Sequence, residues 1–187
     1  MNREKIAYRL SQAFHPAIVE IPAAVLALHL YSITMKEILY FAVAPIAAVT
    51  AAIYLILELP QFKGLDMNIR DDRQTIYPPA IILLCISAGL TSFFEGPAII
   101  QTLYLGTIAI TGMNYFINRK LKISLHTTGM GVVTAVFTSI SLGLGSLFFV
   151  ASGFVAWSRI VLDRHTPLEA ALGFFVSYSF ILASTLI

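Results

Sequence analysis

The chain has 187 residues, of which 58% are hydrophobic and 12% are charged, and its mean hydropathy is +0.82. These values exclude a soluble globular domain and indicate an integral membrane protein. The formal net charge is only +2, so nucleic acid is not an expected partner. The single cysteine, Cys85, cannot form an intramolecular disulfide, and we expect it to be a buried structural thiol.

Apolar runs follow one another along almost the whole chain, and a helix needs about 20 such residues to cross a bilayer. The first run, from about Pro16 to Met35, is interrupted by Glu20 and His29. No small-residue cleavage pattern follows this run, so we expect no signal peptide. Three further runs contain no Lys, Arg, Asp or Glu and are each predicted to cross once: residues 38–57, 74–94 and 96–118.

A longer uncharged run of 36 residues separates Lys122 from Arg159. It is too long for one crossing and long enough for two, and Gly143 to Ser146 supply the expected turn between them. A last run, from Pro167 to Ile187, is predicted to cross once more. The sequence therefore predicts an all-α, polytopic transmembrane helix bundle of about six to seven crossings, in a single domain spanning residues 1–187. The predicted crossings lie near residues 16–35, 38–58, 76–94, 97–117, 127–143, 146–161 and 167–187.

Basic residues are distributed unequally between the two faces that these crossings define. Eleven of the twelve Lys and Arg residues fall on the face that carries the N-terminus, and only Lys36 falls on the other. By the positive-inside rule the first face is cytoplasmic. The inference holds when the basic residues most suspected of binding an anion, Lys63, Arg70 and Arg159, are set aside, because eight of the remaining nine still lie on that face.

Three polar clusters lie on the predicted cytoplasmic face. An arginine can bind a phosphate or carboxylate through two parallel hydrogen bonds. A histidine four residues before a carboxylate can act as a nucleophile or a base with its orienting acid. The clusters are Lys63 with Arg70 and Arg73, then Ser124-Leu125-His126, and then Ser158-Arg159 with His165 and Glu169.

The spacing within these clusters resembles the three signature motifs of the type 2 phosphatidic acid phosphatase (PAP2) superfamily of integral membrane lipid phosphatases. The third motif, Ser158-Arg159-x5-His165-x3-Glu169, matches in every spacing. Ser124-x-His126 is a short match to the second motif, and Lys63-x6-Arg70 is the loosest match, to the first. The resemblance extends from Lys63 to Glu169, which is most of the chain.

The chain also departs from the family pattern. Asp71 stands where the family has a proline, so Arg73 is a second candidate for the first-motif arginine. Ile123 and Leu125 flank the second-motif serine in place of proline and glycine, and Glu169 replaces an aspartate. Two predicted crossings separate the first and second motifs, where many relatives have a loop.

The resemblance implies a role for each matching residue. His165 would attack phosphorus to form a phosphohistidine, Glu169 would hold and polarise that imidazole, and His126 would protonate the leaving alkoxide and then activate water. It further implies a lipid phosphate as substrate and no metal or other cofactor. Independently, phosphoryl transfer needs positive charge around the equatorial oxygens and in-line groups on either side. The implied phosphate ligands are Lys63, Arg70 or Arg73, Ser124 and Arg159.

Several of these residues also fit an ordinary structural role. Thr166-Pro167-Leu168-Glu169 is a capping box, in which Glu169 reaches back to the start of its helix. Lys120 and Lys122 are typical of interfacial anchors at helix ends, and we assign them that role. Arg159 we assign to the site instead, because Ser158 and His165 stand beside it at the family's spacing. Outside the motifs, His15 and His29 match no family residue.

These observations predict an enzyme of the cell membrane that hydrolyses a phosphomonoester or diphosphate of a lipid, such as phosphatidate, phosphatidylglycerol phosphate or a polyprenyl phosphate. Two alternatives stay open. An anion or lipid transporter would use the basic residues as a binding site and would not need both His126 and His165. A magnesium-dependent prenyl-transfer enzyme would hold Mg²⁺ for a diphosphate with Asp66, Asp71 and Asp72, and it would require a second acidic motif.

Overall fold

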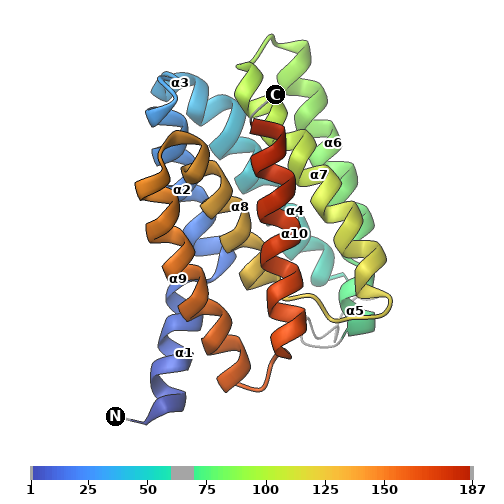
Figure 1. Cartoon of the computed structure of the whole chain (residues 1–187). Coiled ribbons are helices and arrows are strands. Elements are labelled where there is room, and N and C mark those ends of the chain that lie inside the picture. The colour runs from blue at the N-terminus through green and yellow to red at the C-terminus, as the bar shows by residue number, and fades with distance from the viewer. Residues whose placement is uncertain (1, 60–69, 186–187) are drawn as a thin grey trace. The chain divides into compact units, whose positions relative to one another are not determined.

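A computed structural model of the protein describes residues 2–59 and 70–185 (Figure 1). These residues form helices and turns and no strand, so the prediction of an all-α fold is confirmed for them. The chain divides into two compact units. We call Met1–Ser32 together with Lys122–Ile187 the terminal unit, and Ile33–Leu121 the internal unit.

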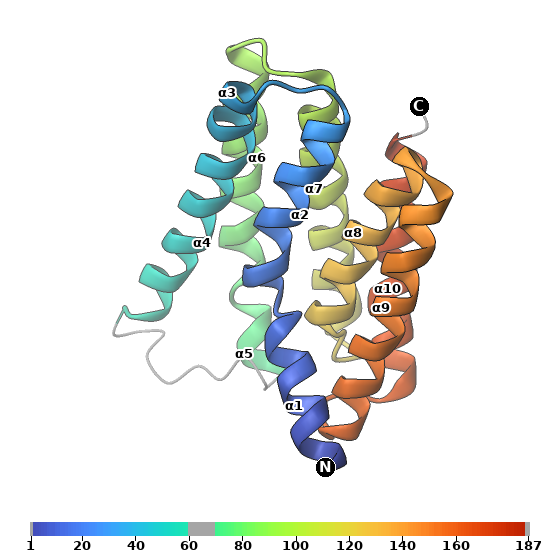
Figure 2. The same ribbon diagram turned by 90° about the vertical axis from the view of Figure 1, so that its left-hand side faces the viewer.

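The terminal unit combines helices from both ends of the chain. In its described part these are α1 (Arg3–Ala13), α2 (Pro16–Leu30), α8 (Leu125–Ile140), α9 (Leu142–Val161) and α10 (Pro167–Thr185). Helix α8 packs against α10, α9 and α2, while α1 packs against α9. Figure 2 shows α8, α9 and α10 side by side. Helix α8 forms the core of this unit, because most of its residues from Thr127 to Phe137 are buried.

Glycines let helix α10 approach α8 closely. A Cβ atom added to Gly173 of α10 would lie 2.7 Å from the backbone oxygen of Ser124. One added to Gly131 of α8 would lie 2.5 Å from the backbone oxygen of Phe174. Real Cβ atoms essentially never come this close to another heavy atom. The two glycines therefore set the distance between the N-terminal halves of the two helices.

The turn between α8 and α9 lies at Ser141, and the prediction of a turn at Gly143–Ser146 is wrong. Ser141 is extended, with φ −160° and ψ 130°, and this single residue separates the two helices. Gly145 lies inside α9, where an added Cβ would collide with Thr138 of α8. Glycine serves close helix packing as well as chain reversal, and residue type alone does not separate the two uses.

The internal unit begins with a continuous helical segment from Met35 to Leu57. It consists of α3 (Met35–Ile38), a π-helical turn η1 (Leu39–Val43) and α4 (Ala44–Leu57). A capping box formed by Thr34 and Glu37 starts this segment. The described residues that follow form α5 (Arg70–Gln74), α6 (Tyr77–Phe93) and α7 (Ala98–Asn118), and α6 packs against α7.

Each predicted crossing contains a helix in the structure. Within the described ranges, four helical segments are long and apolar enough to cross a membrane: Met35–Leu57, Asp72–Phe93, Leu142–Val161 and Pro167–Thr185. Helices α1 and α2, which are bent by 50° to each other, make a fifth if they count as one span. Their apolar surfaces indicate a membrane-associated protein, since Phe93 and Leu142 are each 78% exposed. The count of six to seven crossings stays a prediction, because α7 is not among these segments and α8 has only 16 residues, a length of about 24 Å.

Cys85 lies on α6 with its side chain exposed, so the prediction of a buried thiol is wrong. Its neighbours on the same helix, Ile82 and Ile86, are exposed as well. A thiol behaves as a small apolar group. An exposed thiol beside exposed isoleucines is therefore compatible with a helix surface that lipid, rather than protein, covers.

Candidate active site

Five predicted site residues lie in the terminal unit, at the ends of its helices. Helices α8 and α10 start, and α9 ends, toward the same end of this unit (Figure 1). The fold therefore brings together residues that lie up to 45 positions apart in the sequence. They are Ser124 and His126 at the start of α8, Arg159 in the last turn of α9, His165 in the loop before α10, and Glu169 in the first turn of α10.

The predicted first motif belongs to the internal unit or falls outside the described residues. Arg73 lies in α5 and is 5% exposed, and the neighbouring Gln74 accepts a hydrogen bond from Asn118 Nδ2 at 3.0 Å. Arg70 opens α5, but its side chain is outside the described set. Lys63 lies outside the described residues altogether. The roles of Lys63, Arg70 and Arg73 in binding phosphate stay predictions.

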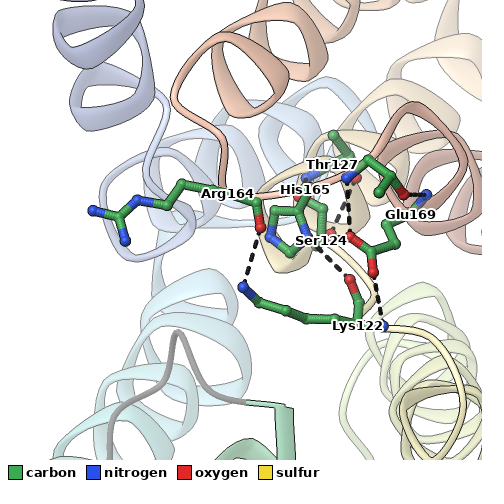
Figure 3. Close-up of polar contacts among 7 residues, drawn as sticks. Lys122, Ser124, Thr127, Arg164, His165 and Glu169 are labelled. Carbon is green, nitrogen blue, oxygen red and sulfur yellow. Dashed lines mark hydrogen bonds and ion pairs between the residues drawn. The ribbon is translucent and has the colours of Figure 1, made fainter.

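Glu169 forms the predicted capping box at the start of α10. Its Oε2 accepts the Thr166 N–H at 3.0 Å, and Thr166 Oγ1 accepts the Glu169 N–H at 3.2 Å. Its Oε1 accepts the Lys122 N–H at 3.2 Å. Oε2 also lies 3.4 Å from Nδ1 of His165 (Figure 3). One carboxylate thus caps a helix, holds the segment before α8 and faces the imidazole, so the structural role of Glu169 does not exclude the predicted functional one.

Lys122 takes part in the scaffold of the site, a role that the sequence analysis missed. Its backbone oxygen lies 2.9 Å from His165 Nδ1, and its ammonium group donates to the backbone oxygen of Arg164 at 3.1 Å. Figure 3 shows the Lys122 backbone on the side of the imidazole that also faces Glu169. The only feature of the sequence that could have predicted this role is the position of Lys122 two residues before Ser124. Contacts made by the backbone do not depend on residue type.

The contact with Lys122 fixes the tautomer of His165. A backbone oxygen can only accept a hydrogen bond, so the neutral ring carries its proton on Nδ1 and its lone pair on Nε2. The Glu169 carboxylate beside Nδ1 would stabilise positive charge that develops on the ring. Screening by water is weak here, since the side chains of His165 and Glu169 are only 2% and 15% exposed.

His126 lies among side chains that carry or can carry positive charge. Its ring packs edge to face on the ring of His15, with the centroids 5.0 Å apart. Burial and the Arg159 guanidinium lower the pKa of His126 to about 3, and His15 and His165 act in the same direction. The imidazole of His126 is therefore neutral at neutral pH.

Arg159 reaches from α9 to the N-terminal helix, where its Nη1 donates to Ser11 Oγ at 2.5 Å. Ser11 is 3% exposed. The sequence analysis predicted neither helix α1 nor a contact between Ser11 and Arg159. It also assigned no role to His15. The only available signal was Pro16, which marks a helix start and hence a break at His15.

Ser124 is the N-cap of α8. Its Oγ accepts the Thr127 N–H at 3.4 Å, and its backbone oxygen accepts from Thr127 Oγ1 at 3.1 Å. The residue is fully buried. An N-cap serine is sufficient to explain this position, so binding of phosphate by Ser124 stays a prediction.

The terminal unit thus combines the imidazole of His165, whose tautomer is fixed, with the neutral imidazole of His126 and the guanidinium of Arg159, which contacts the buried Ser11. These groups are able to supply a nucleophile, an acid–base catalyst and an anion ligand. Within residues 2–59 and 70–185, no group of three or more His, Cys, Asp or Glu side chains is arranged to hold a metal ion.

Comparisons with known proteins add no further constraint. The chain matches no protein-family model, no curated protein and no solved structure. The case for a function therefore rests on the geometry of the terminal unit and on the motifs in the sequence.

Proposed function

We propose that the protein is a membrane lipid phosphatase that forms a phosphohistidine on His165, as the resemblance to the type 2 phosphatidic acid phosphatases implies. One observation carries the proposal: His165 Nδ1 lies 2.9 Å from the Lys122 backbone oxygen and 3.4 Å from the Glu169 carboxylate. Both neighbours favour a proton on Nδ1, and the nucleophilic lone pair is then on Nε2.

In the first step, Nε2 of His165 forms a bond to phosphorus while the bond from phosphorus to the lipid oxygen breaks. Arg159 binds the equatorial oxygens, where negative charge is concentrated. Glu169 stabilises the positive charge that the phosphorylated ring acquires. His126 donates a proton to the departing lipid oxygen, which leaves as an alcohol.

His126 must be protonated to act as this acid, although its lowered pKa keeps it neutral at neutral pH. Burial is the largest cause of the lowered pKa of His126, and the Arg159 charge is the next; a phosphoryl dianion beside Arg159 offsets that charge and stabilises a proton on the imidazole. We therefore expect His126 to acquire its proton when substrate binds. In the second step, neutral His126 takes a proton from water, the water oxygen bonds to phosphorus, and the bond from phosphorus to Nε2 breaks to release inorganic phosphate.

The substrate is a lipid because the catalytic groups stand at the ends of apolar helices with exposed hydrophobic side chains. We place the protein in the cell membrane, with about seven crossings and its catalytic groups at the cytoplasmic boundary, from the distribution of Lys and Arg. Lys63, Arg70, Arg73 and Ser124 complete the set of proposed phosphate ligands.

The test is phosphate release by the purified, full-length protein in detergent containing EDTA. The substrates are short-chain phosphatidate, phosphatidylglycerol phosphate and a polyprenyl phosphate and diphosphate. We expect release from at least one of them, inhibition by orthovanadate, and an acid-labile phosphate label on the protein. His165→Ala should abolish the label and lower turnover on the order of 10³-fold or more. His29→Ala, at an exposed position of α2, is the matched control.

Other results would contradict the proposal. Activity that disappears with EDTA would favour the magnesium-dependent alternative. Absence of phosphate release from every substrate, combined with lipid or anion transport in liposomes that His165→Ala leaves unchanged, would favour a transporter.

A further inference from the structure

Helix α1 packs on the part of α9 that carries Arg159. Its residue Arg3 lies over the ring of Trp157, with Cζ 5.7 Å from the centroid. Ala7 and Ser11 are 0% and 3% exposed, and their spacing of four residues places them on one face of α1. Because both side chains are small, the α1 backbone comes close to α9 along this face.

The bend between α1 and α2 places His15 beside the first turn of α8. Pro16 begins α2 and disfavours a helical conformation at His15, so the chain bends there, by 50°. The start of α2 lies on α8, because a Cβ added to Gly129 would meet Pro16 at 3.6 Å. From this position the His15 ring reaches the His126 ring, 5.0 Å away between centroids.

Ser11, one turn before His15, contacts two residues of the proposed active site. Its Oγ accepts a hydrogen bond from Arg159 at 2.5 Å. Its backbone makes a hydrogen bond with His126 that raises the pKa of the imidazole, as expected when a ring N–H donates to a carbonyl. One buried residue of α1 therefore fixes the direction of both a guanidinium and an imidazole.

We propose that α1 completes an oxyanion-binding site in the terminal unit, in which Ser11 is a positioning residue for Arg159 and His126. His15 holds the His126 ring through edge-to-face packing. The ligand is a phosphoryl oxyanion, carried by a lipid or by free phosphate. The catalytic use of this site rests on the proposed function, but the binding of an oxyanion is measurable without turnover.

The binding test uses orthovanadate titrated calorimetrically into the full-length protein in detergent. Ser11→Ala should weaken binding about tenfold, because hydrogen bonds to charged groups are among the stronger ones. Ser184→Ala is the matched control, since the Ser184 hydroxyl donates to the Ile181 backbone oxygen of its own helix at 2.9 Å, and this variant should bind vanadate as wild type does. Equal affinities for wild type and Ser11→Ala, or no binding by wild type, would overturn the inference. Replacing vanadate by a short-chain lipid phosphate shows which source of the oxyanion binds more tightly.

The kinetic test addresses His15. His15→Ala should lower kcat about tenfold with little change in KM, because a misdirected His126 affects proton transfer more than binding. His15→Phe keeps an aromatic ring and should recover most of the loss, and His29→Ala should match wild type. The role of His15 is overturned if His15→Ala equals His29→Ala, or if His15→Phe is as slow as His15→Ala. Wild-type protein that binds vanadate but releases no phosphate would overturn the proposed function alone, and the vanadate affinities would then decide the role of α1.

Discussion

At the level of single residues, Glu169 caps a helix, and its geometry is compatible with the proposed catalytic role as well. Its Oε2 accepts a hydrogen bond from the Thr166 N–H, and its Oε1 accepts one from the Lys122 N–H. Oε2 also faces His165. A capping interaction usually competes with a catalytic interpretation of the same side chain. Here the cap directs the carboxylate, because a side chain bound at both oxygens has little rotational freedom left.

Glu169→Gln should lower phosphatase turnover on the order of 10²-fold, because the neutral amide does not stabilise positive charge on His165. Glutamine has one acceptor oxygen, so one of the two backbone N–H groups loses its partner, at a cost of about 1 kcal/mol in the free energy of unfolding. The measurements are turnover and the thermal unfolding midpoint in detergent.

Thr166→Ala is the control for this prediction. It removes the hydroxyl that accepts the Glu169 N–H and should cost about 1 kcal/mol of stability, while turnover stays near that of wild type. Near-normal turnover in Glu169→Gln, or an equal loss in Thr166→Ala, would mean that Glu169 acts only as a helix cap.

At the level of helices, the site depends on the close contact between α8 and α10. His126 lies in the first turn of α8 and Glu169 in the first turn of α10, so a change in the distance between these helices alters the separation of the proposed catalytic groups. Gly173, one turn after Glu169, lies at this contact, because an added Cβ would lie 2.7 Å from the Ser124 backbone oxygen. A backbone atom is not able to move aside as a flexible side chain does.

Gly173→Ala should lower the thermal unfolding midpoint and the turnover together, with an overpacking cost of about 1–3 kcal/mol. Gly153→Ala is the matched control, because Gly153 lies in α9 with nothing within 4 Å of an added Cβ. Alanine is favoured over glycine in a helix by about 1 kcal/mol, so this variant should be at least as stable as wild type. Equal midpoints for the two variants would show that α10 does not depend on a glycine at this contact.

At the level of the whole molecule, the orientation in the membrane decides which compartment supplies the substrate. The first residues of α1 and the last residues of α10 lie at opposite ends of the terminal unit (Figure 1). This arrangement agrees with an odd number of crossings, and the proposed seven would leave the N-terminus in the cytoplasm and the C-terminus outside.

Reporters fused to either terminus test this orientation. We expect a cytoplasmic signal from the N-terminal fusion and an external signal from the C-terminal one. A cytoplasmic C-terminus would contradict the count of seven. The error would then lie in the α1–α2 pair, which is bent by 50°, or in the α8–α9 hairpin, since α8 has only 16 residues.

The sequence by itself determined the features that depend on local pattern. Each long apolar run forms a helix, because hydrophobic length is readable from residue type. The capping box at Thr166 and Glu169 was predictable for the same reason, since its partners lie three residues apart. His126, Arg159 and His165 lie at or beside helix ends in the terminal unit, and their catalytic roles stay predictions.

Only the tertiary structure decided how these residues are held. The Lys122 backbone oxygen meets His165 across 43 positions of sequence, and Ser11 meets Arg159 across 148. Backbone contacts leave no trace in residue type, and contacts between distant helices depend on how closely the helices approach. The same reason explains the hairpin, where Gly145, expected to help reverse the chain, serves the packing of α9 on α8.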